Sequence, residues 1–164
     1  MDFRVVPIAE EHIAGFRAAL DDVARERRYL IFLEAPSLEE VRAFVRHNLR
    51  KRHPAFVALA AEEVIGWCDV LPLDRPTRAH TGTLGLAVTA PHRGRGVGTA
   101  LLRETLEAAR ARGLTRIELG VRAANARVVP LYERFGFVRE GVERNAIRQD
   151  GEYEDLIRMA VLFE

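Results

Sequence analysis

One stretch of the sequence, residues 83–102, constrains the fold more than any other. It is TLGLAVTAPHRGRGVGTALL: an apolar segment, a proline, three alternating glycines and a leucine-rich segment. This pattern predicts a buried strand, a turn and a helix. Glycines at a helix start let its first backbone N–H groups approach a ligand, and the helix dipole is positive there. The turn therefore predicts an anion site, to which Arg93 and Arg95 add positive charge.

The spacing of the glycines separates three kinds of phosphate-binding loop. A nucleoside-triphosphate loop needs a lysine after its last glycine, and this loop has none. A dinucleotide loop has the spacing G-x-G-x-x-G and follows the first strand. Here Gly94, Gly96 and Gly98 alternate, and they follow the fourth expected strand. What remains is R-x-x-G-x-G, which begins at Arg93 and is set between a strand and a helix.

Hydrophobic periodicity along the whole chain predicts an α/β fold. Ser37 and Glu40 form a capping box before the second helix, and Asp150-Gly151 is typical of a hairpin turn. The order β α α β β β α β α β β predicts one domain, residues 1–164, with a mixed, mostly antiparallel sheet of about seven strands flanked by helices. Strands are expected at residues 3–8, 56–60, 64–71, 83–88, 117–121, 137–142 and 153–163, and helices near residues 13–23, 41–49, 101–109 and 128–135.

The composition limits the partners of the chain. Its 25 basic and 24 acidic residues leave a net charge of +1, so we expect no nucleic acid and no membrane surface as a partner. No stretch approaches the roughly 18 apolar residues of a membrane span, and no signal-peptide core is visible. The single cysteine, Cys68, excludes an internal disulfide, and no histidine pair has zinc-binding spacing, so no metal is expected. We therefore expect a cytoplasmic protein.

A second motif completes a resemblance to a known family. Residues 125–137, NARVVPLYERFGF, are similar to the signature N-x-x-x-x-x-L-Y-x-x-x-G-F and follow the glycine motif at the family's distance. With both motifs on the expected elements, the chain resembles the GNAT superfamily of acetyltransferases over nearly its whole length. Its ending, DGEYEDLIRMAVL, resembles the small-molecule and amino-acid N-acetyltransferases of that superfamily.

The resemblance implies acetyl-CoA as the cofactor and direct transfer of its acetyl group to a primary amine of a small molecule or amino acid. It implies that pantetheine lies in a gap between the fourth and fifth strands, where a backbone N–H polarises the thioester carbonyl. Tyr132 is the implied general acid for the departing thiolate. The cofactor-binding residues that the resemblance implies are Ala87, Val88, Arg93, Gly94, Arg95, Gly96, Val97, Gly98, Thr99, Asn125 and Tyr132.

Several residues have a second interpretation. Tyr132 could simply pack against the sheet, and Asn125 could cap the short helix that follows it. Cys68 lies in the middle of a strand, where a lone cysteine is typically a small buried hydrophobe rather than a nucleophile. The fourth strand carries no carboxylate to act as a general base, which leaves Glu34, Asp69 or a water relay.

Two other functions stay open at this point. The missing fourth-strand carboxylate is compatible with a non-catalytic module that binds or senses acyl-CoA. A protein N-terminal acetyltransferase is the other alternative, and a peptide-wide groove would favour it. The resemblance also implies a homodimer.

Overall fold

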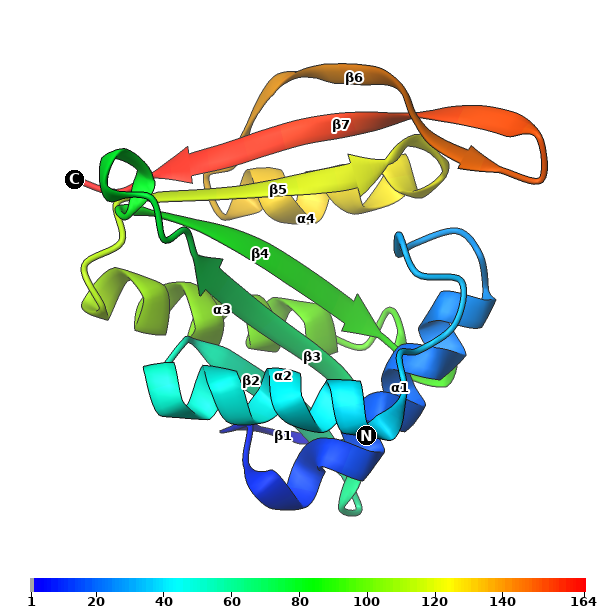
Figure 1. Ribbon diagram of the computed structural model, residues 1–164, viewed down its shortest axis with the longest axis vertical. Helices are drawn as coiled ribbons and strands as arrows, with labels where there is room; N and C mark the ends of the chain where they lie inside the picture. Colours follow the sequence, from blue (N-terminus) through cyan, green and yellow to red (C-terminus); the bar gives the residue numbers. More distant parts are fainter. Residues whose placement is uncertain (1) are drawn as a thin grey trace.

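The computed structural model describes residues 2–164, and its elements follow the order expected from the sequence (Figure 1). The strands are β1 (Arg4–Pro7), β2 (Ala55–Ala60), β3 (Glu63–Pro72), β4 (Thr81–Val88), β5 (Arg116–Arg122), β6 (Val138–Gln149) and β7 (Glu152–Leu162). The helices are α1 (Ile13–Arg25), α2 (Leu38–Lys51), α3 (Val97–Ala111) and α4 (Val129–Arg134), and a 3-10 segment, η4 (Ala123–Val128), precedes α4.

The strands form one seven-stranded sheet in the order β1-β2-β3-β4-β5-β7-β6. β4 and β5 run parallel, and the other neighbouring strands of the described chain are antiparallel. The predicted mixed, mostly antiparallel sheet is therefore confirmed. The parallel pair lies at the centre of the sheet, and the chain passes from the end of β4 into the glycine turn.

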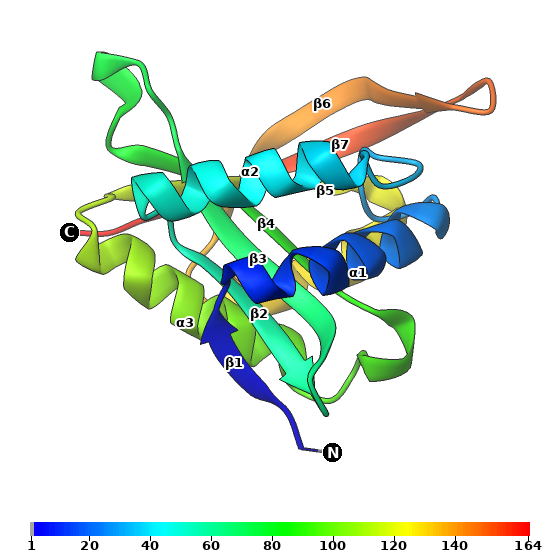
Figure 2. The same cartoon turned by 60° about the horizontal axis from the view of Figure 1, so that its bottom comes forward.

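Alternation along the strands creates two apolar cores, one on each face of the sheet. On one face, α3 and α4 cover residues such as Cys68, Ile117 and Met159. On the other face, α1 and α2 cover β1 to β3, where Trp67 contacts the ring of Phe16 edge-on at 5.4 Å. Figures 1 and 2 show β6 and β7 reaching beyond these helices as a long hairpin.

Local signals in the sequence are confirmed at both ends of this arrangement. The Ser37 side chain accepts from the Glu40 backbone N–H, while the Glu40 side chain accepts from the Ser37 N–H, so α2 begins with a complete capping box. Asp150 and Gly151 both adopt positive φ, at 54° and 80°, as a tight hairpin turn requires.

Two details of the sequence interpretation are wrong. The helix expected near residues 41–49 has Phe44 and Leu49 at the helical spacing of a buried stripe, yet both are exposed, while Asn48 is buried and its side chain contacts His53. β6 continues seven residues beyond the expected end at Val142. Nearly every residue of this strand is exposed, and five of the seven residues 143–149 are polar, so no period-two alternation of apolar residues marks its second half.

Candidate functional site

The parallel pair at the centre of the sheet separates soon after it begins. β4 and β5 pair only over residues 81–83 and 116–118, although β4 continues to Val88 and β5 to Arg122. Beyond this short ladder lies a cavity of about 780 Å³. Its volume is within the range of about 300–1,000 Å³ typical of small-molecule sites. Among its lining residues are Leu86, Ala87 and Val88 of β4, together with Asn125 and Tyr132.

The backbone of β4 presents its polar groups to this gap at every second residue. Thr89 donates its N–H to the Ile65 carbonyl, and Ala87 lies opposite Trp67 in the same ladder. Because an antiparallel ladder alternates, the N–H and C=O of Ala87 point to β3, whereas those of Leu86 and Val88 point into the gap. The family resemblance implied Ala87 and Val88 as cofactor-binding residues. The alternation along β4 adds Leu86 to them, a residue that the sequence interpretation did not include.

The turn after β4 is open to ligand. Gly94 and Gly96 have φ of 73° and 84°, a left-handed conformation that favours glycine. A Cβ placed on either glycine would have no atom within 4 Å, so the space above the turn is empty of protein. Gly96 directly precedes α3, whose first backbone N–H groups have no partner within the helix. This geometry fits a phosphate group at the positive end of the helix dipole.

The other predicted cofactor-binding residues of the turn differ in which of their groups a ligand can reach. Gly98 and Thr99 line the cavity, so both remain candidates for ligand contact. The Val97 side chain is buried against the sheet, and only its backbone is available to a ligand. Arg95 is exposed and does not line the cavity.

Arg93 holds the turn in place through its side chain. Its Nε donates to the Val88 carbonyl at 2.8 Å, and its two terminal nitrogens donate to both oxygens of Glu26 at 2.7 and 2.6 Å. The guanidinium also lies 4.5 Å from the ring centroid of Tyr29. These contacts join the residue that follows α1 to the end of β4. Bidentate charge-assisted bonds of this kind are strong, so they fix the guanidinium, while Nη1 and Nη2 each keep a second N–H and Arg93 lines the cavity.

Tyr132 enters the cavity from α4. Its ring is nearly buried and meets the ring of Phe137 edge-on at 5.5 Å. Burial raises the pKa of the Tyr132 hydroxyl above its usual range, so the group stays protonated and can donate a proton. Burial likewise raises the pKa of the Cys68 thiol, which makes it a poor nucleophile.

Asn125 lies in η4 with a non-helical backbone and lines the cavity. The interpretation that it caps a helix is wrong, because Arg122 precedes η4, Val128 precedes α4, and neither helix start has a side-chain cap. Glu154 of β7 holds this segment: it accepts from Arg122 at 2.6 Å and from the Ala124 N–H at 2.9 Å. No local signal in the sequence indicates this contact, since it spans about thirty residues.

The two carboxylates considered as general bases lie in different environments. The Glu34 side chain is 73% exposed and pairs with Arg25 at 3.5 Å. Asp69 of β3 is half-buried opposite Gly85, and burial raises the pKa of its carboxyl to about 7. Neither side chain lines the 780 Å³ cavity. Asp69 lies on the face of the sheet that α1 and α2 partly cover, the face opposite Cys68.

Two further properties concern residues 2–164 as a whole. No helix in this range is long and apolar enough to cross a membrane. No group of three or more histidine, cysteine or acidic side chains within the same residues is arranged to hold a metal ion.

Known proteins resemble this chain in sequence. L-amino acid N-acetyltransferase AaaT of Escherichia coli is 34% identical over 105 residues, 63% of this chain and 65% of its own length. N-acetyltransferase 8B of Rattus norvegicus is 35% identical over 88 residues, 52% of this chain and 40% of its own. The chain thus spans less than two thirds of the length of either relative. L-methionine sulfoximine/L-methionine sulfone acetyltransferase of Pseudomonas aeruginosa is 32% identical over 133 residues, 79% of this chain and 77% of its own.

Solved structures share the fold. An N-acetyltransferase from Staphylococcus aureus Mu50 matches with a TM-score of 0.93 over 100% of both chains, at 20% identity. The protein yncA of Salmonella typhimurium, solved with its cofactor acetyl-CoA, matches with a TM-score of 0.93 over 100% of this chain and 95% of its own, at 16% identity. In sequence, residues 16–137 match the Acetyltransferase (GNAT) family, a span well over half of the 164 residues. The resemblance carried by the two motifs is confirmed, and the chain belongs to the Acetyltransferase (GNAT) family.

Proposed function

We propose that this protein transfers an acetyl group from acetyl-CoA directly to the primary amine of a small molecule, with amino acids as the favoured class. The observation that carries the proposal is the open glycine turn at the start of α3, beside the cavity where β4 and β5 separate. The names of AaaT and of the Pseudomonas aeruginosa relative support amino acids or their derivatives as acceptors.

Different groups of the chain bind different parts of acetyl-CoA. The backbone N–H groups of residues 94–99 hold the pyrophosphate, aided by the dipole of α3. The backbone of Leu86 and Val88 binds the pantetheine arm, and Asn125 contacts the same arm from η4. Acetyl-CoA supplies the acetyl group as an activated thioester. An N–H of β4 that points into the gap stabilises the charge that develops on the thioester oxygen.

Tyr132 donates its proton to the sulfur as the carbon–sulfur bond breaks. The raised pKa of its hydroxyl keeps the proton in place at neutral pH. Arg93 positions the turn through its bonds to Glu26 and the Val88 carbonyl, and it also lines the cavity beside the phosphate position. A cytoplasmic location remains a prediction from the sequence. The homodimer is a prediction from the family resemblance, and light scattering tests it.

A thiol-release assay over a panel of amines tests the proposal. With acetyl-CoA and the twenty common L-amino acids, we expect release of free CoA matched mole for mole by an N-acetyl product in mass spectrometry. Binding of acetyl-CoA without thiol release would instead support the non-catalytic sensory module. Turnover restricted to peptides would support a protein N-terminal acetyltransferase.

A further inference from the structure

Two glycines face each other across the gap in the sheet. The last parallel pair joins Thr83 of β4 to Glu118 of β5, and Gly85 and Gly120 lie two residues further along their strands. Both belong to the face that α1 and α2 partly cover, because Ile117 and Leu119 of β5 face the α3 core. On this face, therefore, neither strand has a side chain at the edge of the gap at these two positions.

From one side, the carboxylate of Asp69 lies over Gly85. These two residues are directly paired in the β3–β4 ladder. A Cβ on Gly85 would be 3.3 Å from Oδ1 of Asp69, so the carboxylate extends toward the gap. Within residues 2–164 this carboxylate has neither a hydrogen bond nor a salt bridge, although it is half-buried. A half-buried carboxylate without a partner is costly unless a ligand or solvent satisfies it.

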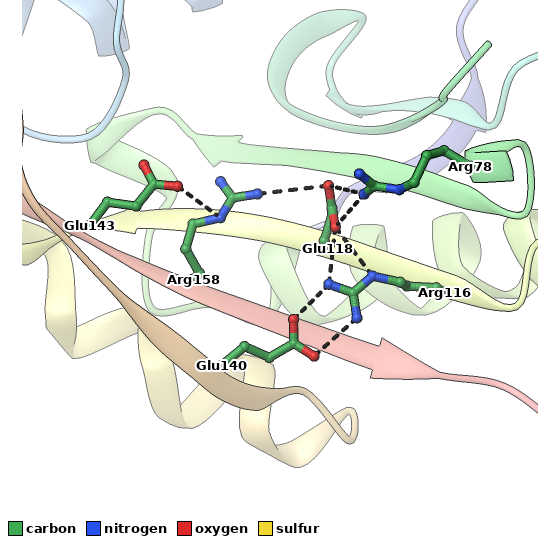
Figure 3. A network of polar contacts seen from close by, with 6 residues as sticks. All are labelled: Arg78, Arg116, Glu118, Glu140, Glu143 and Arg158. Atoms are coloured by element: carbon green, nitrogen blue, oxygen red, sulfur yellow. Dashed lines mark hydrogen bonds and ion pairs between the residues drawn. The ribbon is translucent and has the colours of Figure 1, made fainter. Parts of the chain in front are cut away.

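From the other side, the guanidinium of Arg158 lies over Gly120. These residues are paired in the β5–β7 ladder, and a Cβ on Gly120 would be 2.9 Å from Nη1 of Arg158. Arg158 lies between Glu118 and Glu143 (Figure 3), with nitrogen-to-oxygen distances of 3.8 Å to Glu118 and 3.6 Å to Glu143. Both distances exceed those of hydrogen bonds.

The other arginines of this network are more firmly held. Arg116 donates to Glu118 and Glu140, the shortest of these bonds being 2.6 Å (Figure 3). Arg78 donates to both oxygens of Glu118 at 3.3 Å. An incoming carboxylate can therefore bind the guanidinium of Arg158 while displacing fewer existing hydrogen bonds than it would at Arg116 or Arg78.

We propose that Asp69 and Arg158 bind the two charges of an amino-acid acceptor, the ammonium at Asp69 and the carboxylate at Arg158, above Gly85 and Gly120. The inference rests on the proposed function and deepens it, because it assigns the acceptor class to particular residues. A carboxylate and a guanidinium on opposite sides of a glycine floor are complementary to a zwitterion. They place the amine at the gap beside β4, whose backbone faces the thioester in the proposed function.

Asp69 then serves as the proton acceptor. It takes one proton from the acceptor ammonium, directly or through one water, and leaves a nitrogen lone pair that forms the new carbon–nitrogen bond. The carbon–sulfur bond breaks, the sulfur receives the Tyr132 proton, and the second proton lost by nitrogen restores Tyr132. Because burial raises the pKa of Asp69 to about 7, the group can both accept and release a proton near neutral pH.

The carboxylate role is tested with paired acceptors. The best amino acid of the panel is compared with the amine that has the same side chain but lacks the carboxylate. In the wild type we expect the amino acid to be preferred in kcat/KM. Arg158→Ala should lower that preference about 10- to 100-fold, mostly through KM, since a hydrogen-bonded charge is lost. Arg158→Lys should restore part of it, and Arg139→Ala is the matched control because Arg139 pairs with Met159 and faces the other side of β6.

The proton-acceptor role is tested with Asp69→Asn. We expect kcat to fall about 10²- to 10⁴-fold with KM for acetyl-CoA unchanged, and the acidic limb of the pH–rate profile near pH 7 to disappear. Glu34→Gln is the control, since Glu34 is exposed and paired with Arg25. Full activity in Asp69→Asn, or an equally large loss in Glu34→Gln, would overturn the assignment.

Calorimetry separates a failure of this inference from a failure of the proposed function. Each amino acid is titrated into protein saturated with CoA. If the wild type shows no turnover but binds an amino acid with an affinity that Arg158→Ala lowers, the result supports the subsite and contradicts the transferase function. If the wild type acetylates amines with no preference for a carboxylate, the function stands and the subsite falls. If it neither turns over nor binds any amino acid, both fall.

Discussion

Arg93 shows how a residue of a ligand-binding motif can also hold that motif in place through contacts within the protein. The motif places it where a phosphate contact is expected, yet its donors reach Glu26 and the Val88 carbonyl. Both side chains of the pair are about three-quarters shielded from solvent. The pair therefore fixes the start of the glycine turn against the end of α1.

Glu26→Gln tests this role without touching the turn itself. Removing one partner of a half-buried, bidentate pair leaves a charge unsatisfied, so we expect the free energy of unfolding to fall by about 1–3 kcal/mol, measured by urea denaturation. Acetyl-CoA binding should weaken as well, because the turn loses its support. The exposed pair Arg4–Glu62 provides the control, and Glu62→Gln should cost about 1 kcal/mol or less. Unchanged stability in Glu26→Gln would show that Arg93 is not held in this way.

Tyr132→Phe isolates the proposed acid. The ring and its packing on Phe137 are kept, and only the hydroxyl is lost. We expect turnover to fall about 10²-fold, at the low end for proton transfer because a thiol is already a good leaving group. Affinity for acetyl-CoA, measured by calorimetry, should change little. Equal turnover in the variant and the wild type would remove the acid role.

Asp69 also predicts a dependence of stability on pH. Its carboxyl has a pKa of about 7 in the folded protein and about 4 in an unfolded chain. Between these values the folded state holds a proton that the unfolded state has released, so this group makes the free energy of unfolding fall as pH rises from about 4 to 7. Its ladder partners Ala55 and Gly85 are uncharged, and the thiol of Cys68 beside it stays protonated throughout.

Asp69→Asn should therefore be more stable than the wild type at pH 8, and the difference should disappear near pH 4. Thermal or urea unfolding at the two pH values measures it. The prediction needs no substrate, so it examines the environment of Asp69 independently of catalysis. A difference that does not vary with pH would contradict a raised pKa.

At the scale of elements, the turn between β4 and α3 matters most. Gly96 and Gly113 lie at opposite ends of α3, both have positive φ, and a Cβ on either would meet no atom within 4 Å. A substitution at either position carries the same kind of backbone strain. Only Gly96 lines the cavity.

Gly96→Glu should abolish acetyl-CoA binding in calorimetry, because the new carboxylate occupies and repels the pyrophosphate position. Gly113→Glu should lose a comparable amount of stability and retain binding. Loss of binding in both variants, or in neither, would show that the turn does not hold the phosphates.

Elements whose cause is local could be predicted from the sequence. The capping box at Ser37, the hairpin turn at Asp150 and the glycine turn each depend on a few adjacent residues. Contacts made by distant segments could not. Arg93 and Glu26 are 67 residues apart, and the placement of Arg158 over Gly120 depends on the register between β5 and β7. The motifs therefore indicated the donor site, while the acceptor side emerged only from the assembled sheet.

At the scale of the whole molecule, the separation of β4 from β5 connects the two faces of the sheet. The segment between α1 and α2 lies near one end of this gap: Arg122 donates to the Leu30 carbonyl at 2.9 Å, and Arg27 pairs with Asp150 in the hairpin turn at 2.9 Å. The donor turn and Tyr132 are on the side of α3 and α4, and Asp69 and Arg158 are on the other face. Donor and acceptor thus approach the gap from opposite faces.

A crystal structure with CoA bound tests this account most directly. The account predicts the pyrophosphate over residues 94–98, the pantetheine arm along the backbone of Leu86 and Val88, and the sulfur within reach of the Tyr132 hydroxyl. A nucleotide bound elsewhere, or a pantetheine arm that avoids the gap between β4 and β5, would contradict it.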